Sequence, residues 1–195
     1  MSEPRVKGLV IREFLVWYTE NHGQDRIREL VEGAREDLRR YLGGPDPIAN
    51  LLAASWYPAR LAYLILDKVT EGFPETAIAT QAKGAARALV KRQMGNGVYR
   101  FFLKRVVTPQ LYAASVPRMW RQLHSTGDRR MRITGQGTAE SSVSNWTGHH
   151  PVLCTITLET MCAVFDLMGC KDVRYKRVTC VSRGATECTT QVTWK

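Results

Sequence analysis

The C-terminal stretch from Pro151 to Lys195 constrains the fold of this chain most strongly. Apolar residues recur at helical spacing from Leu153 to Met168, which predicts an amphipathic helix. Two alternating runs follow, Asp172 to Val181 and Glu187 to Trp194, and such alternation predicts strands. The short turn between them contains Gly184, so we expect the two strands to pair as an antiparallel hairpin.

All five cysteines of the chain lie in this stretch: Cys154, Cys162, Cys170, Cys180 and Cys188. In the predicted hairpin Cys180 and Cys188 fall opposite each other, and directly opposed residues have Cβ atoms roughly 4.5–5.5 Å apart. Two thiolates at that distance can share a metal ion. We expect both sulfurs to point toward the helix start that carries Cys154. Without a metal the three sulfurs would form a small apolar contact.

The rest of the chain divides into a helical front half and a strand-rich back half. Apolar spacing predicts helices at Lys7 to Asn21, Gln24 to Glu32, Arg35 to Leu42, Ala59 to Thr70, Glu75 to Gln93, Val98 to Val107 and Leu111 to His124. The apolar run from Ile48 to Trp56 has no period that decides its structure. After Gly127 the period changes to two, which predicts strands at Arg129 to Thr134 and Thr138 to Trp146.

The order of these elements predicts the fold class. With the terminal helix and hairpin, the back half reads as a β-β-α-β-β unit that builds a four-stranded antiparallel sheet. A helical N-terminal half followed by this unit indicates an α+β fold. A length of 195 residues fits one domain, so we expect residues 1–195 to fold as a single unit. A bulge near Lys176 would reconcile the two side-chain phases of the first hairpin strand, and would put Val178 on the same face as Cys180.

Composition indicates a soluble globular protein, with 44% hydrophobic and 24% charged residues. The longest apolar runs are shorter than the roughly 18–20 residues of a membrane span. The N-terminus lacks the layout of a signal peptide. An odd number of cysteines without an export signal favours reduced thiols, so we expect a cytoplasmic protein.

The net charge of +10 is unevenly distributed, because no Asp or Glu occurs between Thr76 and Gly127. The basic residues of this segment are candidates for contacting phosphates: Lys83, Arg87, Lys91, Arg92, Arg100, Lys104 and Arg105. Such a field attracts nucleic acid, a phosphate-bearing ligand or an acidic protein face. The alternative is a solvated basic surface that serves solubility.

Several short motifs, taken in order, resemble a known family. They are Lys7-Gly8-Leu9-Val10, Trp56-Tyr57-Pro58, Val98-Tyr99-Arg100-Phe101-Phe102-Leu103, Pro117-Arg118-Met119-Trp120, and the ending Cys180, Gly184, Cys188 and Val192-Thr193-Trp194. Over almost its whole length the chain resembles a paralogous family of uncharacterised proteins abundant in myxobacteria. That family is related to the 4-vinyl-reductase domain and, more distantly, to haem-nitric-oxide-binding sensors and TRAPP-complex subunits.

The resemblance implies an internal apolar pocket between the helices and the four-stranded sheet, which relatives use for small aromatics, tetrapyrroles or acyl chains. Aromatic side chains that could line it are Trp56, Tyr99, Phe102, Trp120 and Trp146. The same side chains could instead fill an ordinary core, since aromatics dominate cores in general.

The resemblance also makes zinc a candidate cofactor. The 4-vinyl-reductase domains of aromatic-sensing regulators build a zinc site from three cysteines and an acidic residue, and Cys154, Cys180 and Cys188 match the cysteine positions. The acidic position holds Arg177 here, which cannot bind zinc. Substitutes for the fourth ligand are Glu187, His149 and His150.

Haem is disfavoured by the sequence. The related sensors bind iron through a histidine on a central helix, and the central helices from Ala77 to Leu123 contain none. His124 follows at the far end, so a haem would need a tyrosine ligand such as Tyr99 or Tyr112.

The sequence contains no recognisable catalytic motif, which argues against an enzyme. The leading hypothesis is a non-catalytic cytoplasmic sensor or adaptor that binds a small apolar or aromatic molecule and acts through protein contacts, as a homodimer. The alternative is a nucleic-acid or phosphate-binding protein that uses the basic segment 76–127.

Overall fold

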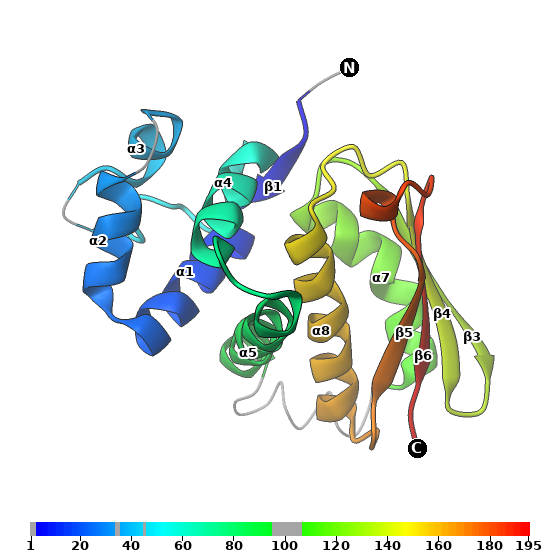
Figure 1. Cartoon of the computed structure of the whole chain (residues 1–195). Coiled ribbons are helices and arrows are strands. Elements are labelled where there is room, and N and C mark those ends of the chain that lie inside the picture. The colour runs from blue at the N-terminus through cyan, green and yellow to red at the C-terminus, as the bar shows by residue number, and fades with distance from the viewer. Residues whose placement is uncertain (1–2, 34–35, 45, 95–106) are drawn as a thin grey trace.

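The computed structural model describes residues 3–33, 36–44, 46–94 and 107–195, in which a helical part packs against a sheet-containing part (Figure 1). The first part begins with a small antiparallel sheet of β1 (Arg5–Lys7) and β2 (Trp56–Pro58). Its helices are α1 (Gly8–His22), α2 (Gln24–Glu32), α3 (Glu36–Leu42), α4 (Ala59–Thr70) and α5 (Glu75–Met94).

The second part is a four-stranded antiparallel sheet with two helices on one face (Figure 1). Its elements are α7 (Pro109–Leu123), β3 (Asp128–Gly135), β4 (Thr138–Ser144), α8 (Pro151–Met168), β5 (Arg174–Thr179), a 3-10 turn (Val181–Arg183) and β6 (Cys188–Thr193). The strand order is β3-β4-β6-β5, so the last strand of the chain lies inside the sheet. The predicted α+β class, with a helical front half and a β-β-α-β-β unit, is confirmed.

Helix α8 forms the centre of the molecule, because it lies between α5 and the sheet (Figure 1). Pro151 begins it, and Gly169 ends it in the left-handed conformation at φ 96°. Among the described residues α8 is the one helix long and apolar enough to cross a membrane, with mean hydropathy 1.5. More than half of it is buried inside the fold, which is typical of a core helix.

Three local expectations from the sequence have different outcomes. The apolar run from Ile48 to Trp56 forms turns that lead into β2. The helix expected at Val98 to Val107 lies almost wholly outside the described residues. The bulge expected near Lys176 is present in β5, between Arg177 and Thr179.

The position of this bulge decides which side chains of β5 face the core. Val178 is 53% exposed and Cys180 is 1% exposed, so the prediction that they share a face is wrong. The extra residue of the bulge turns Val178 outward and brings Thr179 opposite Thr189 on β6.

A close contact between α1 and α5 fixes how the first part packs. Trp17 of α1 is 6% exposed, and its ring lies against Gly84 of α5. A Cβ atom at Gly84 would lie 2.9 Å from Cζ2 of that indole. Since the ring is enclosed by the core, it has little room to move away.

We predict that Gly84→Ala destabilises the protein by about 1–3 kcal/mol through overpacking, although Gly to Ala ordinarily stabilises a helix. Chemical denaturation followed by circular dichroism measures the change. The exposed neighbour gives the control, because Lys83→Ala should change the free energy of unfolding by less than about 0.5 kcal/mol. A higher denaturation midpoint for Gly84→Ala would contradict this packing.

Candidate metal centre and ligand cavity

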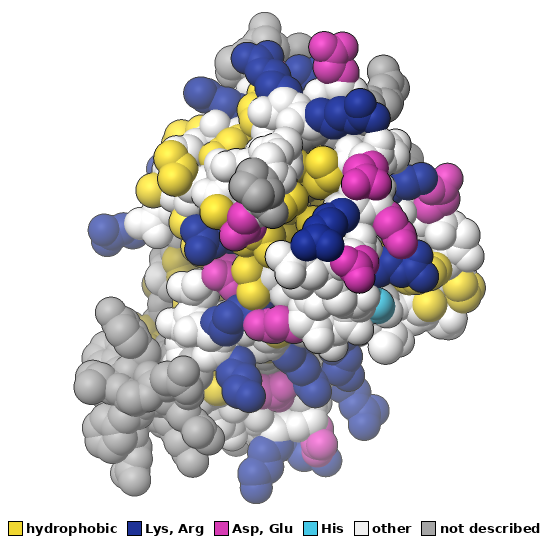
Figure 2. Space-filling view, turned by 90° about the vertical axis from the view of Figure 1, so that its left-hand side faces the viewer, with side chains coloured by type: hydrophobic (Ala, Val, Ile, Leu, Met, Phe, Trp, Pro, Cys, Tyr) yellow, Lys and Arg dark blue, Asp and Glu magenta, His cyan; other side chains and the backbone are white. Residues whose placement is uncertain are grey.

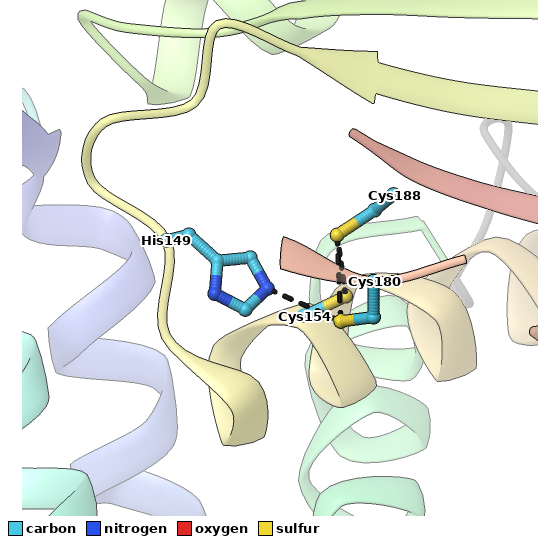
Figure 3. Close-up of side chains that lie close together, drawn as sticks. All are labelled: His149, Cys154, Cys180 and Cys188. Carbon is cyan, nitrogen blue, oxygen red and sulfur yellow. Dashed lines mark hydrogen bonds between the residues drawn. The ribbon is translucent and has the colours of Figure 1, made fainter. Parts of the chain in front are cut away.

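Four potential metal ligands converge where the terminal hairpin meets the start of α8 (Figure 3). His149 comes from the loop before α8, Cys154 from the first turn of α8, Cys180 from the end of β5 and Cys188 from the start of β6. Their ligand atoms all lie within 4.8 Å of one another. The three cysteines are buried and the histidine is partly buried.

The separations within this cluster are those of a tetrahedral site. The Cys180 and Cys188 sulfurs lie 3.5 Å apart, and the Cys154 and Cys188 sulfurs 4.0 Å. Nε2 of His149 lies 3.5 Å from the sulfur of Cys180. A tetrahedral zinc ion with Zn–S bonds of about 2.3 Å places its sulfurs about 3.8 Å apart. The cluster therefore needs only small shifts to enclose an ion.

The turn of the hairpin brings Cys180 and Cys188 together. Gly184 adopts φ 85° and closes the turn with a hydrogen bond from its N–H to the carbonyl of Val181. Below the turn, the Thr179 hydroxyl donates to the carbonyl of Glu187 and accepts from the N–H of Thr189. These bonds fix the register of β5 and β6 at the bulge, where Thr179 pairs with Thr189. Cys180 and Cys188 are the next residues of the two hairpin strands toward the turn.

The electrostatics of the cluster favour a thiolate at Cys188. A hydrogen bond from the Cys154 thiol lowers the pKa of Cys188, and His149 and the N–H of Val181 lower it further. The pKa of Cys154 is raised, because its proton bonds to Cys188 and its sulfur is buried. Since the thiolate is the form that binds metals, Cys188 is prepared to accept one.

The loop that carries His149 is tied to α4. The ring of His150 stacks on Tyr63 with centroids 5.2 Å apart, and its Nε2 lies 2.9 Å from Oδ1 of Asp67. The Tyr63 hydroxyl also donates to the carbonyl of Gly148. These contacts turn His150 toward α4 and leave His149 to face the sulfurs.

The other sequence candidates for the fourth ligand position lie elsewhere. Neither His150 nor Glu187 belongs to the cluster of His149 and the three cysteines. Arg177, which the resemblance predicted at the acidic ligand position, donates to the hydroxyl of Thr155 at 3.0 Å. Of the three substitutes considered from the sequence, His149 is the one that joins the cysteines.

A cavity of about 150 Å³ lies beside α8, between α1, α5, α7 and β3. Its wall is mainly apolar, with Met119, Leu153, Ile156 and Val164 among the lining side chains. Two basic side chains also line it, His124 after α7 and Arg129 on β3. Sequence reasoning did not propose either as a pocket residue, because a helix end and an alternating basic strand both suggest solvent.

The ring of His124 is inside the fold. The side chain is 6% exposed and stacks on Trp120 with centroids 3.9 Å apart. Burial, aided by the charge of Arg129, lowers the pKa of His124 to about 3, so the imidazole is neutral at pH 7. The guanidinium carbon of Arg129 lies 5.8 Å from the centre of the Trp120 ring.

The aromatic residues predicted to line a pocket are dispersed. Trp120 lines the cavity, and Trp146 packs on Trp120 edge to face at 4.9 Å. Trp56 lies in β2, under the ammonium group of Lys7 at 4.4 Å. Tyr99 and Phe102 lie outside the described residues.

The basic segment is partly neutralised by acids from other elements. Arg92 pairs with Glu13 and Glu20 of α1 at 2.8 Å each, and Arg87 lies 3.6 Å from Asp166 of α8. On the face of the N-terminal helices, Lys and Arg side chains alternate with Asp and Glu (Figure 2). Lys83 and Lys91 also lie on α5, whereas Arg100, Lys104 and Arg105 fall outside the described residues.

Comparison with known proteins identifies the fold. No family model and no curated protein matches the sequence. An H-NOX protein from S. oneidensis, solved in its Fe(II)NO state, superposes with a TM-score of 0.63 at 13% identity, covering 97% of this chain and 99% of that one. Unliganded Fe(II) H-NOX from K. algicida gives a TM-score of 0.66 at 11% identity, covering 97% and 96%. The chain has the H-NOX fold.

This result matches the more distant relationship expected from the sequence, since H-NOX domains are haem-nitric-oxide-binding sensors. At 10–13% identity, the H-NOX likeness establishes fold alone. The closer relationships to the 4-vinyl-reductase domain and to the myxobacterial family stay predictions.

The prediction from the sequence that haem is disfavoured is wrong. Solved structures with the H-NOX fold are haem proteins, including one in a study of haem redox potential and porphyrin distortion. The sequence placed His124 at the far end of the central helices and turned to tyrosines as the ligands that a haem would need. In the structure the backbone of His124 pairs with Val6, and its side chain lines the cavity. A histidine at the end of a helix can therefore reach the interior here.

We predict that Glu13→Gln lowers the free energy of unfolding by about 1–3 kcal/mol, because it leaves the half-buried Arg92 without the more buried of its two charge partners. Thermal and urea denaturation measure this effect. Glu29→Gln is the matched control, since Glu29 pairs with Arg26 on the exposed face of α2 and should show no measurable change. Equal effects of the two variants would contradict the role of Glu13.

Proposed function

We propose that this chain is a ligand-binding sensor domain in which a zinc ion fixes the terminal hairpin to α8. The convergence of one imidazole nitrogen and three sulfurs within 4.8 Å carries the zinc assignment. Four protein ligands complete a tetrahedral ion and leave no open position, which is typical of a structural zinc site. The ion therefore stabilises the fold and takes no part in a reaction.

The role of a sensor is supported by the H-NOX fold and by the cavity beside α8. Zinc at the hairpin would hold β6, which is an inner strand of the sheet. The same sheet supplies Arg129 to the cavity. The ion would therefore keep one wall of the ligand site in place. We further propose that residues 1–195 form one cytoplasmic domain that acts through protein contacts as a homodimer.

Haem binding is a second candidate, favoured by the donors that line the cavity. His124 offers a neutral imidazole that could bind iron, and the guanidinium of Arg129 suits a propionate carboxylate. The haem would supply an iron atom that binds a diatomic gas. At about 150 Å³ the cavity is smaller than the usual 300–1,000 Å³ of ligand pockets, so it would have to widen to admit haem.

We predict that the purified protein contains about one zinc ion per chain, since four ligands saturate one ion. Cys188→Ser or His149→Ala should release it and lower the free energy of unfolding by about 4 kcal/mol, a loss characteristic of a lost metal. Elemental analysis by mass spectrometry and thermal denaturation measure both effects.

Cys162 provides the matched control, because it is a buried cysteine of α8 that lies outside the cluster. Cys162→Ser should keep the zinc ion. The zinc proposal fails if the wild-type protein, purified with added zinc and without chelator, contains no metal and Cys188→Ser unfolds at the wild-type temperature.

A further inference from the structure

The cavity contains buried polar atoms that have no partner. Nδ1 of His124 and both Nε and Nη2 of Arg129 are buried, and none forms a hydrogen bond in the part of the chain that the structure describes. Buried donors without a partner are costly and are rare in native proteins. Two residues of this kind at one cavity indicate that a missing group normally pairs with them.

The unpartnered atoms define the shape of that group. Nε and Nη2 lie on one edge of the guanidinium, and this edge presents two parallel N–H donors. Such a fork matches the two oxygens of a carboxylate in a bidentate pair. The neutral imidazole of His124 can donate a further N–H to the same group.

The charge of the cavity favours an anion. No Asp or Glu is among the described residues that line it, and none of the ion pairs between described residues includes Arg129. The hydroxyls of Thr157 and Thr160 already donate to carbonyls of α8, to Leu153 and Ile156 respectively. A guanidinium without a carboxylate partner in an apolar wall is therefore the main charged feature that a ligand would meet.

The size of the cavity limits the body of the ligand. Its volume is about 150 Å³, and an apolar cavity of about that size in another protein is known to bind benzene. The indole of Trp120 and the side chains of Met119, Ile156 and Val164 supply apolar contacts for one ring.

We propose that this cavity binds a small aromatic carboxylate, with the ring among the apolar side chains and the carboxylate held by Arg129 and His124. The inference rests on the proposed sensor function and names the class of ligand for that site. A haem propionate would present the same carboxylate chemistry, so the experiment includes haem as a separate arm.

The test measures binding to the full-length zinc-loaded protein by titration calorimetry. Benzoate is compared with benzamide, which has nearly the same shape and no charge. We expect benzoate to bind at least tenfold more tightly than benzamide. Arg129→Gln should remove this preference while leaving benzamide binding unchanged.

Arg130→Gln is the matched control. Arg130 is the next residue of β3, is exposed, and pairs with Ser142 on the opposite face of the sheet, so its loss should not alter benzoate binding. A second measurement needs no variant. The Arg129 Nε–H signal in ¹⁵N spectra of the wild-type protein should shift on addition of benzoate and remain in place on addition of benzamide.

The outcomes separate this inference from the proposed function. Equal affinity for benzoate and benzamide, with no effect of Arg129→Gln, overturns the ligand class and leaves the sensor function standing. Stoichiometric uptake of haem with a Soret band, without benzoate binding, also overturns the small carboxylate and supports the haem candidate. If a folded, zinc-loaded protein binds none of the three probes, the inference and the sensor function both fail.

Discussion

The register of the sheet places both sites of this protein on one row of residues. Arg129 of β3 pairs with Val143 of β4, and Val143 pairs with Cys188 of β6. This row faces the helices, where Val143 and Cys188 are buried. A slip of one residue in either pairing would move a member of the row to the solvent face. The cavity and the candidate metal centre therefore depend on the same strand pairing.

Aromatic packing also connects the cavity with the candidate metal centre. Trp120, which lines the cavity, contacts Trp146 at 4.9 Å, and Trp146 contacts His149 at 5.0 Å. Edge-to-face contacts of this kind add to the apolar burial and restrict ring orientation. The ring of His149 is thus positioned from one side by Trp146 and from the other by Cys180. Zinc at the cluster would stiffen the wall that a ligand contacts.

Local signals in the sequence predicted the order of the helices and strands and part of the candidate metal centre. The spacing of Cys180, Gly184 and Cys188 indicated a hairpin, and helical spacing placed Cys154 at a helix start, so the three cysteines could be named. His149 could be named as one of three candidates for the fourth ligand. Long-range packing was not predictable from such signals. The acids that neutralise Arg92 come from α1, and His124 enters the interior because its backbone pairs with Val6. Tertiary contacts alone distinguish His149 from its neighbour His150.

X-ray absorption at the zinc edge reports the atoms bound to the ion and so distinguishes this centre from a zinc site elsewhere in the protein. We expect three sulfurs at about 2.3 Å and one nitrogen at about 2.0 Å from the zinc. His149→Ala should lose the nitrogen shell and keep the sulfurs. A first shell of oxygen and nitrogen atoms without sulfur would show that the ion binds elsewhere and would contradict the proposed centre.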